Sequence, residues 1–450
     1  RTVVSPPTAT DRSPAPRPDV TVVVASRNRR DDLLASLPRH EAPVVLVDNA
    51  STDGVVELVE RGFPEVRIVR SQENKGFAGG NNLALRDLEG VDLVALVNND
   101  VTVSQGWLDP LVEALRADPD LGAASPKMLL EGRYRRLDLV TASEPPRPAD
   151  RRSLGVAVVE VIPPAGASGA PRFGPGFYEP ERDGLHDVRW SLPEATMFVP
   201  TSMDSAAHLT CELVLDSPRD KRVEVRSGEA RTMLEVRRGR HRYEVALAGD
   251  DIDLINNVGS VLLENHYAAD RGWLEPDEGQ YALPEDVFAW SGGAVLLRAE
   301  YLRDVGLFDE RLFLYYEDLE LSWRGGRRGW RYRYVPDSTV RHVHAATALQ
   351  DSAMARYFNE RNRLLVLARH APLRVSAAAT VWFVLSTLSY VRRDVVAPVL
   401  RGRRPRGAIV LTRLRAFGGF LLRVPPQLRD HLLLSVVRHR MGGKQPTDHR

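Results

Sequence analysis

The sequence has little of several features that mark a class of protein. It contains one cysteine, Cys211, which excludes an internal disulfide, and it has no Cys/His spacing of the zinc-binding type. This cysteine usage suits a reducing compartment, so we expect a cytoplasmic protein. The net charge is only +1, which gives the whole chain no basic excess for nucleic acid, and we predict no nucleic-acid partner.

A secretory apolar core is also missing from residues 1–18, which are rich in Pro, Arg, Ser and Thr. We predict a disordered leader over these residues. The rest is ordinary for a globular protein, with 43% hydrophobic and 27% charged residues. A length of 450 residues allows two or three domains.

Short apolar runs alternate with helical patterns in the first part of the chain. We expect buried strands at Asp19–Ala25, Val44–Val47, Val66–Val69 and Leu93–Val97. Uninterrupted apolar runs of this length suit strands that are buried on both faces of a parallel sheet. The sequence therefore predicts an α/β fold with a mostly parallel, Rossmann-like sheet.

Polar residues follow the carboxyl ends of three of these strands, where open α/β sheets bind ligands. Asn98-Asn99-Asp100 comes after the last strand, and its carboxylate and amides could hold a hard cation and a sugar or phosphate oxygen. Taken alone, the triplet is better explained as an Asn/Asp turn. The neighbouring segments have to decide between these two interpretations.

Four blocks, read together, resemble the family 2 glycosyltransferases of GT-A fold in wording, order and spacing: Thr21–Arg30, Val47–Gly54, Asn74–Asn82 and Asn98–Asp100. The resemblance implies a nucleotide-sugar donor bound by Ala25, Arg27, Asp48, Asn74, Gly76, Asn82, Asn98 and Asn99. It also implies that Asp100 is the acid of a D-x-D-like motif that holds Mn²⁺ or Mg²⁺. Asn98 departs from the motif, and a neutral amide there would bind the cation less strongly. From the residues alone, Asp48 is equally natural as a helix cap.

The pattern changes after Met128. Pro-, Gly- and Arg-rich turns lead into short alternating runs up to about residue 250, which are typical of an antiparallel β-sandwich or small barrel. We therefore predict a β-rich module at 145–250, inserted between a nucleotide-sugar-binding half (19–144) and an acceptor half (251–370). Its role stays open between binding a carbohydrate or partner and a structural one.

The acceptor half carries further signals of the same family, and Ile252–Gly259 and Asp270–Gly272 also resemble it. By resemblance, the Gly-Gly-Ala strand places Gly292 and Gly293 beside the acceptor. Trp290 could stack on a sugar, although core packing is equally expected. Glu317 and Asp318 begin a helix, where acids also suit the helix dipole. The resemblance makes Asp318 the catalytic base and Glu317 its acceptor-binding or orienting neighbour. We expect Glu320 and Arg324 to form a surface pair on this helix.

Two histidines follow the next strand. The resemblance favours His342 as a second metal or diphosphate ligand, with His344 as the reserve. Downstream, a helix presents polar residues that we place near phosphate or acceptor: Arg356, Asn359, Arg361 and Asn362.

The tail, residues 371–450, is predicted to be helical and basic. Val375–Val391 has no charge and lies at the lower length limit for a membrane-spanning helix. The arginines that follow are interleaved with apolar residues, as in helices that lie on anionic membranes. A peripheral position at the cytoplasmic face of the cell membrane and a soluble oligomerisation tail are equally expected.

These features predict an inverting, metal-dependent glycosyltransferase. It would move a sugar from a nucleotide-diphosphate donor to a hydroxyl of a glycan or lipid-linked acceptor in cell-surface polysaccharide synthesis, and the resemblance suggests rhamnose or galactose. Two alternatives stay open: a nucleotidyltransferase, and a non-catalytic carbohydrate-binding protein with a degenerate transferase domain.

Overall fold

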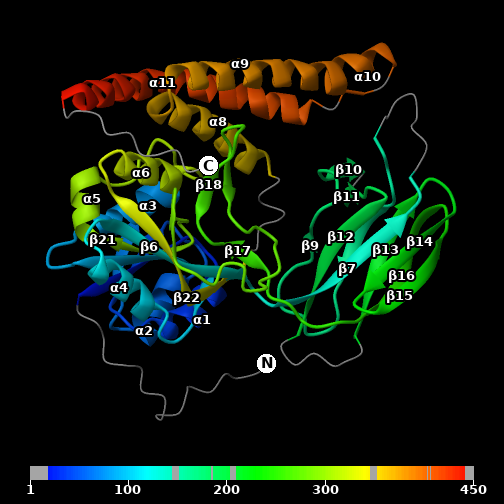
Figure 1. Ribbon diagram of the computed structural model, residues 1–450, viewed down its shortest axis with the longest axis horizontal. Coiled ribbons are helices and arrows are strands. Elements are labelled where there is room, and N and C mark those ends of the chain that lie inside the picture. Colours follow the sequence, from blue (N-terminus) through cyan, green and yellow to red (C-terminus); the bar gives the residue numbers. More distant parts are fainter. Residues whose placement is uncertain are drawn as a thin grey trace, which may run out of the picture.

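The computed structural model describes residues 19–143, 152–183, 186–202, 209–344, 352–402, 404–405 and 407–440. The predicted leader, residues 1–18, lies outside them. Figure 1 shows three parts: an α/β domain, a β-rich module beside it, and a layer of long helices across one end.

The α/β domain is built on one sheet with the strand order β20-β22-β6-β21-β4-β1-β2-β3. Six of these strands run in one direction, while β21 is antiparallel between β4 and β6, and β20 is antiparallel to β22. Two short strands, β5 and β17, pair with β22 and β6. The strand bounds are β1 Val20–Ser26, β2 Val44–Asn49, β3 Arg67–Ser71, β4 Leu93–Asn98, β5 Val101–Val103, β6 Leu121–Leu130, β17 Ile255–Asn257, β20 Glu285–Val287, β21 Ala294–Arg298 and β22 Arg331–His342.

Helices cover both faces of this sheet. One face packs against α1 (Arg30–Ser36), α2 (Val55–Gly62) and α4 (Leu108–Ala117), and the other against α3 (Gly76–Leu85), α5 (Ala299–Val305) and α6 (Glu317–Gly326). Along β4, Ala95 and Val97 enter the first core, whereas Val94 and Leu96 enter the second. Since both faces of the strands are buried, polar side chains gather where the strands end.

The module is an antiparallel β-sandwich with sheet orders β10-β11-β8-β13-β16 and β15-β14-β7-β12-β9, closed over one apolar core. The strand bounds are β7 Arg133–Thr141, β8 Ala157–Ile162, β9 Arg172–Phe173, β10 Glu181–Asp183, β11 His186–Trp190, β12 Glu194–Thr201, β13 Leu209–Ser217, β14 Lys221–Ser227, β15 Ala230–Val236 and β16 Gly239–Leu247. The inserted sandwich is as predicted, but its start is not. Because β7 pairs with β12 and β14, the module begins at Arg133, ahead of the predicted residue 145.

The helical layer consists of α8 (Ala353–His370), α9 (Leu373–Tyr390), a π-helical turn (Val391–Val396), α10 (Ala397–Leu400) and α11 (Ala408–Arg440). It packs on the α/β domain through an apolar cluster that includes Leu312, Leu319, Leu365 and Phe383. A short hairpin, β18 (Ser260–Leu262) and β19 (Ala268–Asp270), rises toward the layer (Figure 1). The predicted fold class, a mostly parallel GT-A sheet with an inserted antiparallel module and a helical tail, is confirmed.

Candidate active site

The carboxyl ends of β1, β2 and β4 meet at one edge of the sheet. Ala25 lies in register with Val47 on one side and Asn98 on the other. Asn99 donates from Nδ2 to Ser26 Oγ at 3.0 Å and so ties the two strand ends together. Asp48 is buried there and accepts from Ser51 N–H at 2.9 Å, which is the capping role that its neighbours also allowed. The parallel pairing thus gathers the predicted donor residues Ala25, Asp48, Asn98 and Asn99, while Arg27 is exposed at the same edge.

The glycine-rich loop before α3 joins the two halves of the domain. Asn74 is exposed and accepts from Gly76 N–H at 3.0 Å. Gly76 has φ +67°, and a Cβ there would lie 2.2 Å from Phe313 O, so only glycine fits. Asn82 is 3% exposed, and its side-chain amide donates to Phe308 O and accepts from Phe308 N–H. The donor-binding role predicted for Asn82 is therefore wrong, because its amide bridges the two halves.

Asp100 and His342 meet where β4 and β22 end. Asp100 Oδ1 lies 3.0 Å from His342 Nε2, and His342 Nδ1 lies 2.8 Å from Asn256 Oδ1. Arg29 adds a more distant cation, at 3.7 Å from Asp100 Oδ2. Burial alone would raise the pKa of Asp100, but the hydrogen bond and charge of His342, with Arg29, lower it below its ordinary value. Asp100 is thus held as a carboxylate.

The Asp100–His342 pair fits a divalent cation. If a cation replaces the proton between His342 Nε2 and Asp100, Nδ1 can still donate to Asn256 Oδ1, and the Nε2 lone pair and an Asp100 oxygen would both be available to the cation. No group of three or more His, Cys, Asp and Glu in the described part of the chain could hold a metal. Two protein ligands nevertheless suffice for Mg²⁺ or Mn²⁺ when substrate phosphates and water complete the shell.

A pocket of about 530 Å³ extends from His342 to the start of α6. Its wall combines the sheet edge, the β18–β19 hairpin and the loop before α6, and it includes Phe77, Asn98, Asn256, Tyr267, Asp270, Ser291, Gly292, Gly293, Tyr315, Glu317, Asp318, His342, His344 and Asn359. The proposed base Asp318, the two glycines predicted to bind the acceptor, one predicted donor residue (Asn98) and one predicted metal ligand (His342) therefore face one space. Burial, followed by the nearby positive charge of His342, lowers the pKa of His344 to about 4, so it is neutral near pH 7.

Asp318 and Glu317 lie at the inner end of this pocket, each in a different setting. Asp318 Oδ2 accepts from Gly292 N–H at 2.9 Å and Oδ1 from Leu319 N–H at 2.7 Å, which fixes the carboxylate. Burial raises the pKa of Asp318, and it raises the pKa of Glu317 well above the ordinary value, helped by the charge of Asp318. Only Asp318 therefore has its carboxylate held for use as a base.

The loop that precedes α6 is strained and is held from outside. Phe313, Tyr315 and Tyr316 all have positive φ, at 68°, 66° and 72°. Asn362, on α8, donates from Nδ2 to the carbonyls of Leu312, Leu314 and Tyr315 at 2.8 to 2.9 Å. One buried amide thus fixes the loop that carries Glu317 and Asp318.

We expect Asn362→Ala to destabilise the protein by about 2–4 kcal/mol, because the carbonyls of Leu314 and Tyr315 lose the amide donor that holds them. Transfer activity should fall as well, since the loop would no longer hold Asp318 in place. Denaturant unfolding measures the first effect, with the exposed Asn265→Ala as control. Stability equal to that of the wild type would show that the loop does not depend on Asn362.

The raised pKa of Glu317 makes stability depend on pH. The folded protein retains a proton that the unfolded chain releases near 4.5, so stability falls as pH rises above that value toward the raised pKa. Glu317→Gln removes this titration. We expect the variant to gain stability relative to the wild type as pH rises from about 4 to about 8, measured by thermal unfolding. If the stability difference between the variant and the wild type stays constant across that pH range, Glu317 does not have the raised pKa on which the prediction depends.

Several predicted positions have a different role in the structure. Trp290 is 0% exposed and packs edge-on against Phe308, so its predicted acceptor contact is wrong. Gly292 and Gly293 do line the pocket. The pair Glu320–Arg324 is not at the surface as predicted: Glu320 is 1% exposed and also bonds Arg369 and His370. Arg361, like Asn362, turns inward to loop carbonyls rather than to the pocket.

Three residues at the site had no role assigned from the sequence. Asn256 orients His342, and Asp270 lies in the pocket with a pKa that burial raises to about 6. Both belong to segments that resemble the family, which was a usable signal. Arg172 comes from β9 of the module, is 2% exposed, and donates to the carbonyls of Val343 and His344. Nothing in its local sequence indicated this contact.

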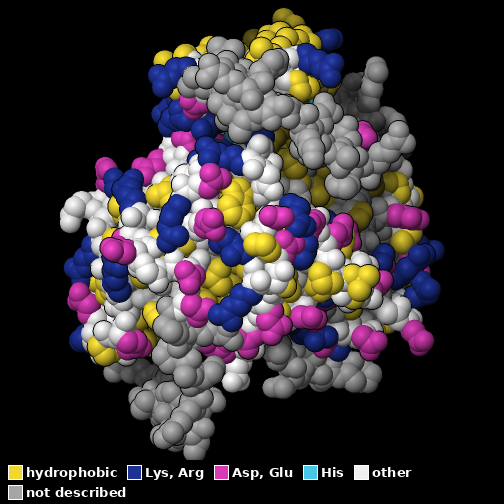
Figure 2. Space-filling view, turned by 60° about the vertical axis from the view of Figure 1, so that its left-hand side comes forward, with side chains coloured by type: hydrophobic (Ala, Val, Ile, Leu, Met, Phe, Trp, Pro, Cys, Tyr) yellow, Lys and Arg dark blue, Asp and Glu magenta, His cyan; other side chains and the backbone are white. Residues whose placement is uncertain are grey.

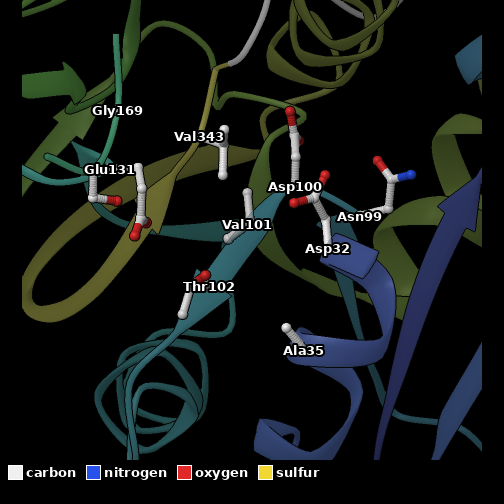
Figure 3. Close-up of a pocket in the computed structure, with 10 residues that line it drawn as sticks. Asp32, Ala35, Asn99, Asp100, Val101, Thr102, Glu131, Gly169 and Val343 are labelled. Carbon is white, nitrogen blue, oxygen red and sulfur yellow. The ribbon is translucent and has the colours of Figure 1, made fainter. Parts of the chain in front are cut away.

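Asp100 itself lines a smaller pocket of about 300 Å³. Figure 3 shows Asp32 and Asp100 on one side of it and Glu131 on the other, with Gly169 of the module nearby. Asp100 therefore faces this smaller space, which Ser168 and Gly169 of the inserted module help to close, while His342 faces the larger pocket.

Curated relatives match part of the chain. An N-acetylglucosaminyl-diphospho-decaprenol L-rhamnosyltransferase of Mycobacterium tuberculosis is 34% identical over 122 residues, which are 26% of this chain and 38% of that protein. A pre-mycofactocin glycosyltransferase of the same organism is 36% identical over 147 residues, 31% of this chain and 30% of that protein. The chain thus spans well under half the length of the curated relatives it matches.

Solved glycosyltransferase structures align with the chain at low identity and low TM-score. GalNAc-T7 with UDP, GalNAc and Mn²⁺ aligns with a TM-score of 0.42 and 13% identity, over 78% of this chain and 47% of that one. The mannosyltransferase PcManGT from Pyrobaculum calidifontis, with GDP-Man and Mn²⁺, aligns with a TM-score of 0.35 and 15% identity, over 96% and 79%.

Family descriptions match both halves of the α/β domain. Glycosyl transferase family 2 matches residues 21–163, and Glycosyl transferase family group 2 matches residues 234–402. Together the two matches cover more than half of the chain, and they include the strand ends, Asp100, Asp318 and His342. The chain belongs to the family 2 glycosyltransferases.

Proposed function

We propose that this protein is an inverting glycosyltransferase that uses a nucleotide-diphosphate sugar and a divalent cation. The observation that carries the proposal is the pocket itself, in which an oriented carboxylate, Asp318, shares one space with His342 and Asn98. A base and a diphosphate-binding edge facing one cavity suit a single displacement at a sugar carbon.

In this reaction Asp318 accepts the proton of an acceptor hydroxyl while that oxygen bonds to the anomeric carbon. The bond from this carbon to the donor phosphate breaks, and the nucleoside diphosphate leaves with the bonding electrons. The raised pKa of Asp318 suits a base that must hold the proton after transfer. Hydrogen bonds from Gly292 N–H and Leu319 N–H fix the orientation of the Asp318 carboxylate during the step.

Asp100 and His342 would hold the divalent cation, with Asn256 fixing the imidazole. When bound, such a cation neutralises charge that develops on the departing diphosphate. Asn98 and Asn99 add neutral amides at the same edge, so the cation site draws its negative charge from Asp100.

The acceptor is proposed to be a glycan or a lipid-linked sugar in cell-surface glycan synthesis. The name of the matching rhamnosyltransferase supports this class, because that protein acts on a decaprenol-linked sugar. The pocket is also lined by the β18–β19 hairpin and by Asn359 of α8, and α8 belongs to the helical layer.

The test is a product analysis with a panel of nucleotide-sugars, with and without Mn²⁺. Release of a nucleoside diphosphate and an inverted anomeric centre, read by NMR, is the expected result. Release of pyrophosphate would identify a nucleotidyltransferase instead. Retained configuration at the anomeric carbon would exclude the single displacement. Donor binding without any turnover would support the alternative of a non-catalytic carbohydrate-binding protein.

A further inference from the structure

The outer face of the helical layer is apolar and uncovered. We define it by the exposed apolar side chains of α9 and α11: Val381, Trp382, Leu385 and Leu388 on α9, and Leu411, Leu414, Leu421 and Leu422 on α11. Trp382 is 67% exposed and Leu422 is 80% exposed. Large apolar side chains gathered on one face of a protein mark an interaction surface.

The opposite sides of α9 and α11 are buried by packing against the rest of the protein. Ala379, Phe383 and Phe420 are buried in the cluster that joins the layer to the α/β domain. Arg413 of α11 is buried and pairs with Glu360 of α8, and it also donates to Thr387 of α9 at 3.0 Å. The layer therefore has one side committed to protein and one side available.

Among the described residues, one stretch, Leu373–Leu400, is long and apolar enough to cross a membrane. Crossing would pull α9 away from α8 and α11, and the buried guanidinium of Arg413 would lose its acceptors on α9, the Thr387 and Ser386 hydroxyls and the Phe383 carbonyl. A helix that buries one side in protein and exposes the other to lipid is satisfied when it lies flat at the membrane surface.

Charge is strongly divided between the tail and the rest of the chain. Residues 371–450 carry 15 Lys and Arg against three Asp, whereas residues 1–370 carry 46 against 57 Asp and Glu. Exposed arginines accompany the apolar face: Arg374 and Arg392 bracket α9, and Arg415 and Arg429 lie on α11. The acids of the described tail, Asp394 and Asp430, are both ion-paired.

We infer that this face docks flat on an anionic lipid bilayer. Figure 2 shows apolar and basic side chains next to one another at the top of the molecule, where the layer lies. An apolar stripe flanked by arginines matches the lipid chains and the negative headgroups of such a surface at once. A second copy of the chain would bring two positive faces together, so charge complementarity favours lipid. The inference goes beyond the proposed reaction and does not rest on it.

The test uses the full chain and vesicles of phosphatidylcholine alone or mixed with phosphatidylglycerol. We expect cosedimentation with the mixed vesicles to exceed that with neutral vesicles at least about tenfold and to weaken in high salt. Arg392→Gln should lower binding about fivefold. The double variant Trp382→Ser/Leu385→Ser should lower it more, while Met233→Ser, an equally exposed apolar residue of the module, should not change it.

The depth of Trp382 in the bilayer provides a second measurement. Brominated lipids should quench part of the tryptophan fluorescence, and this part should disappear in Trp382→Phe. Equal binding to neutral and anionic vesicles, or full binding by the double variant, would overturn the inference. So would a lipid-free dimer that the double variant abolishes, or resistance of the membrane-bound protein to carbonate extraction, since these indicate a second copy and a spanning helix. Transfer to a soluble acceptor should be unchanged in the double variant, which separates this inference from the proposed reaction.

Discussion

Asp318→Asn should lower the rate of sugar transfer by about 10²- to 10⁴-fold, the range that general base catalysis contributes. The amide can still occupy the space beside Gly292, so the loop and pocket should stay intact. It cannot accept the acceptor proton, and that is the lost step. Initial rates with saturating donor and acceptor measure the effect, and donor binding by calorimetry should stay within about twofold of the wild type.

Two comparisons make this result specific. Asp337→Asn, at an exposed position of β22, should transfer sugar at the wild-type rate. Glu317→Gln should lose less activity than Asp318→Asn, because burial raises the pKa of Glu317 well above its ordinary value and so favours the neutral form that glutamine resembles. Normal transfer by Asp318→Asn would remove the base assignment, and a greater loss in Glu317→Gln would move it to Glu317.

Asp100→Asn should raise the Mn²⁺ concentration needed for half-maximal activity by about 10- to 100-fold. The reason is that Asp100 supplies the one protein charge in a ligand set otherwise made of an imidazole and amides. Titration of Mn²⁺ into metal-stripped protein, followed by activity and by calorimetry in the presence of a nucleoside diphosphate, measures the shift.

Asn256→Ala should shift the same titration in the same direction by a smaller factor, because it frees the imidazole of His342 without removing a ligand. The exposed Asp120→Asn is the matched charge control. If Asp100→Asn binds and uses Mn²⁺ like the wild type, the proposed cation site is wrong.

Much of this site could be predicted because it depends on local patterns. The run Leu93–Val97 is apolar at every position, as a strand buried on both faces requires, so Asn98-Asn99-Asp100 had to stand at its carboxyl end. The acids that begin α6 were likewise visible, since a helix starts at Glu317. The family resemblance then supplied roles for these residues.

Contacts between distant segments could not be predicted in this way. Asn82 bonds a residue 226 positions away, and no local pattern separates that amide from one that faces a ligand. Trp290 suits a sugar platform and a core equally well until the position of Phe308 is known. The start of the module was missed because β7 follows β6 directly, and the Pro-rich composition begins only after β7 ends.

Arg172 also changes how the insertion should be treated by anyone who redesigns this chain. The module leaves the α/β domain after β6 and returns to it before β17, and both of these strands pair with one another next to His342. Shortening the chain between them would remove the guanidinium that holds the carbonyls of Val343 and His344. A minimal transferase made by excising the sandwich would therefore need a replacement donor at that turn, and exchanging the sandwich for another would require an arginine in the place of Arg172.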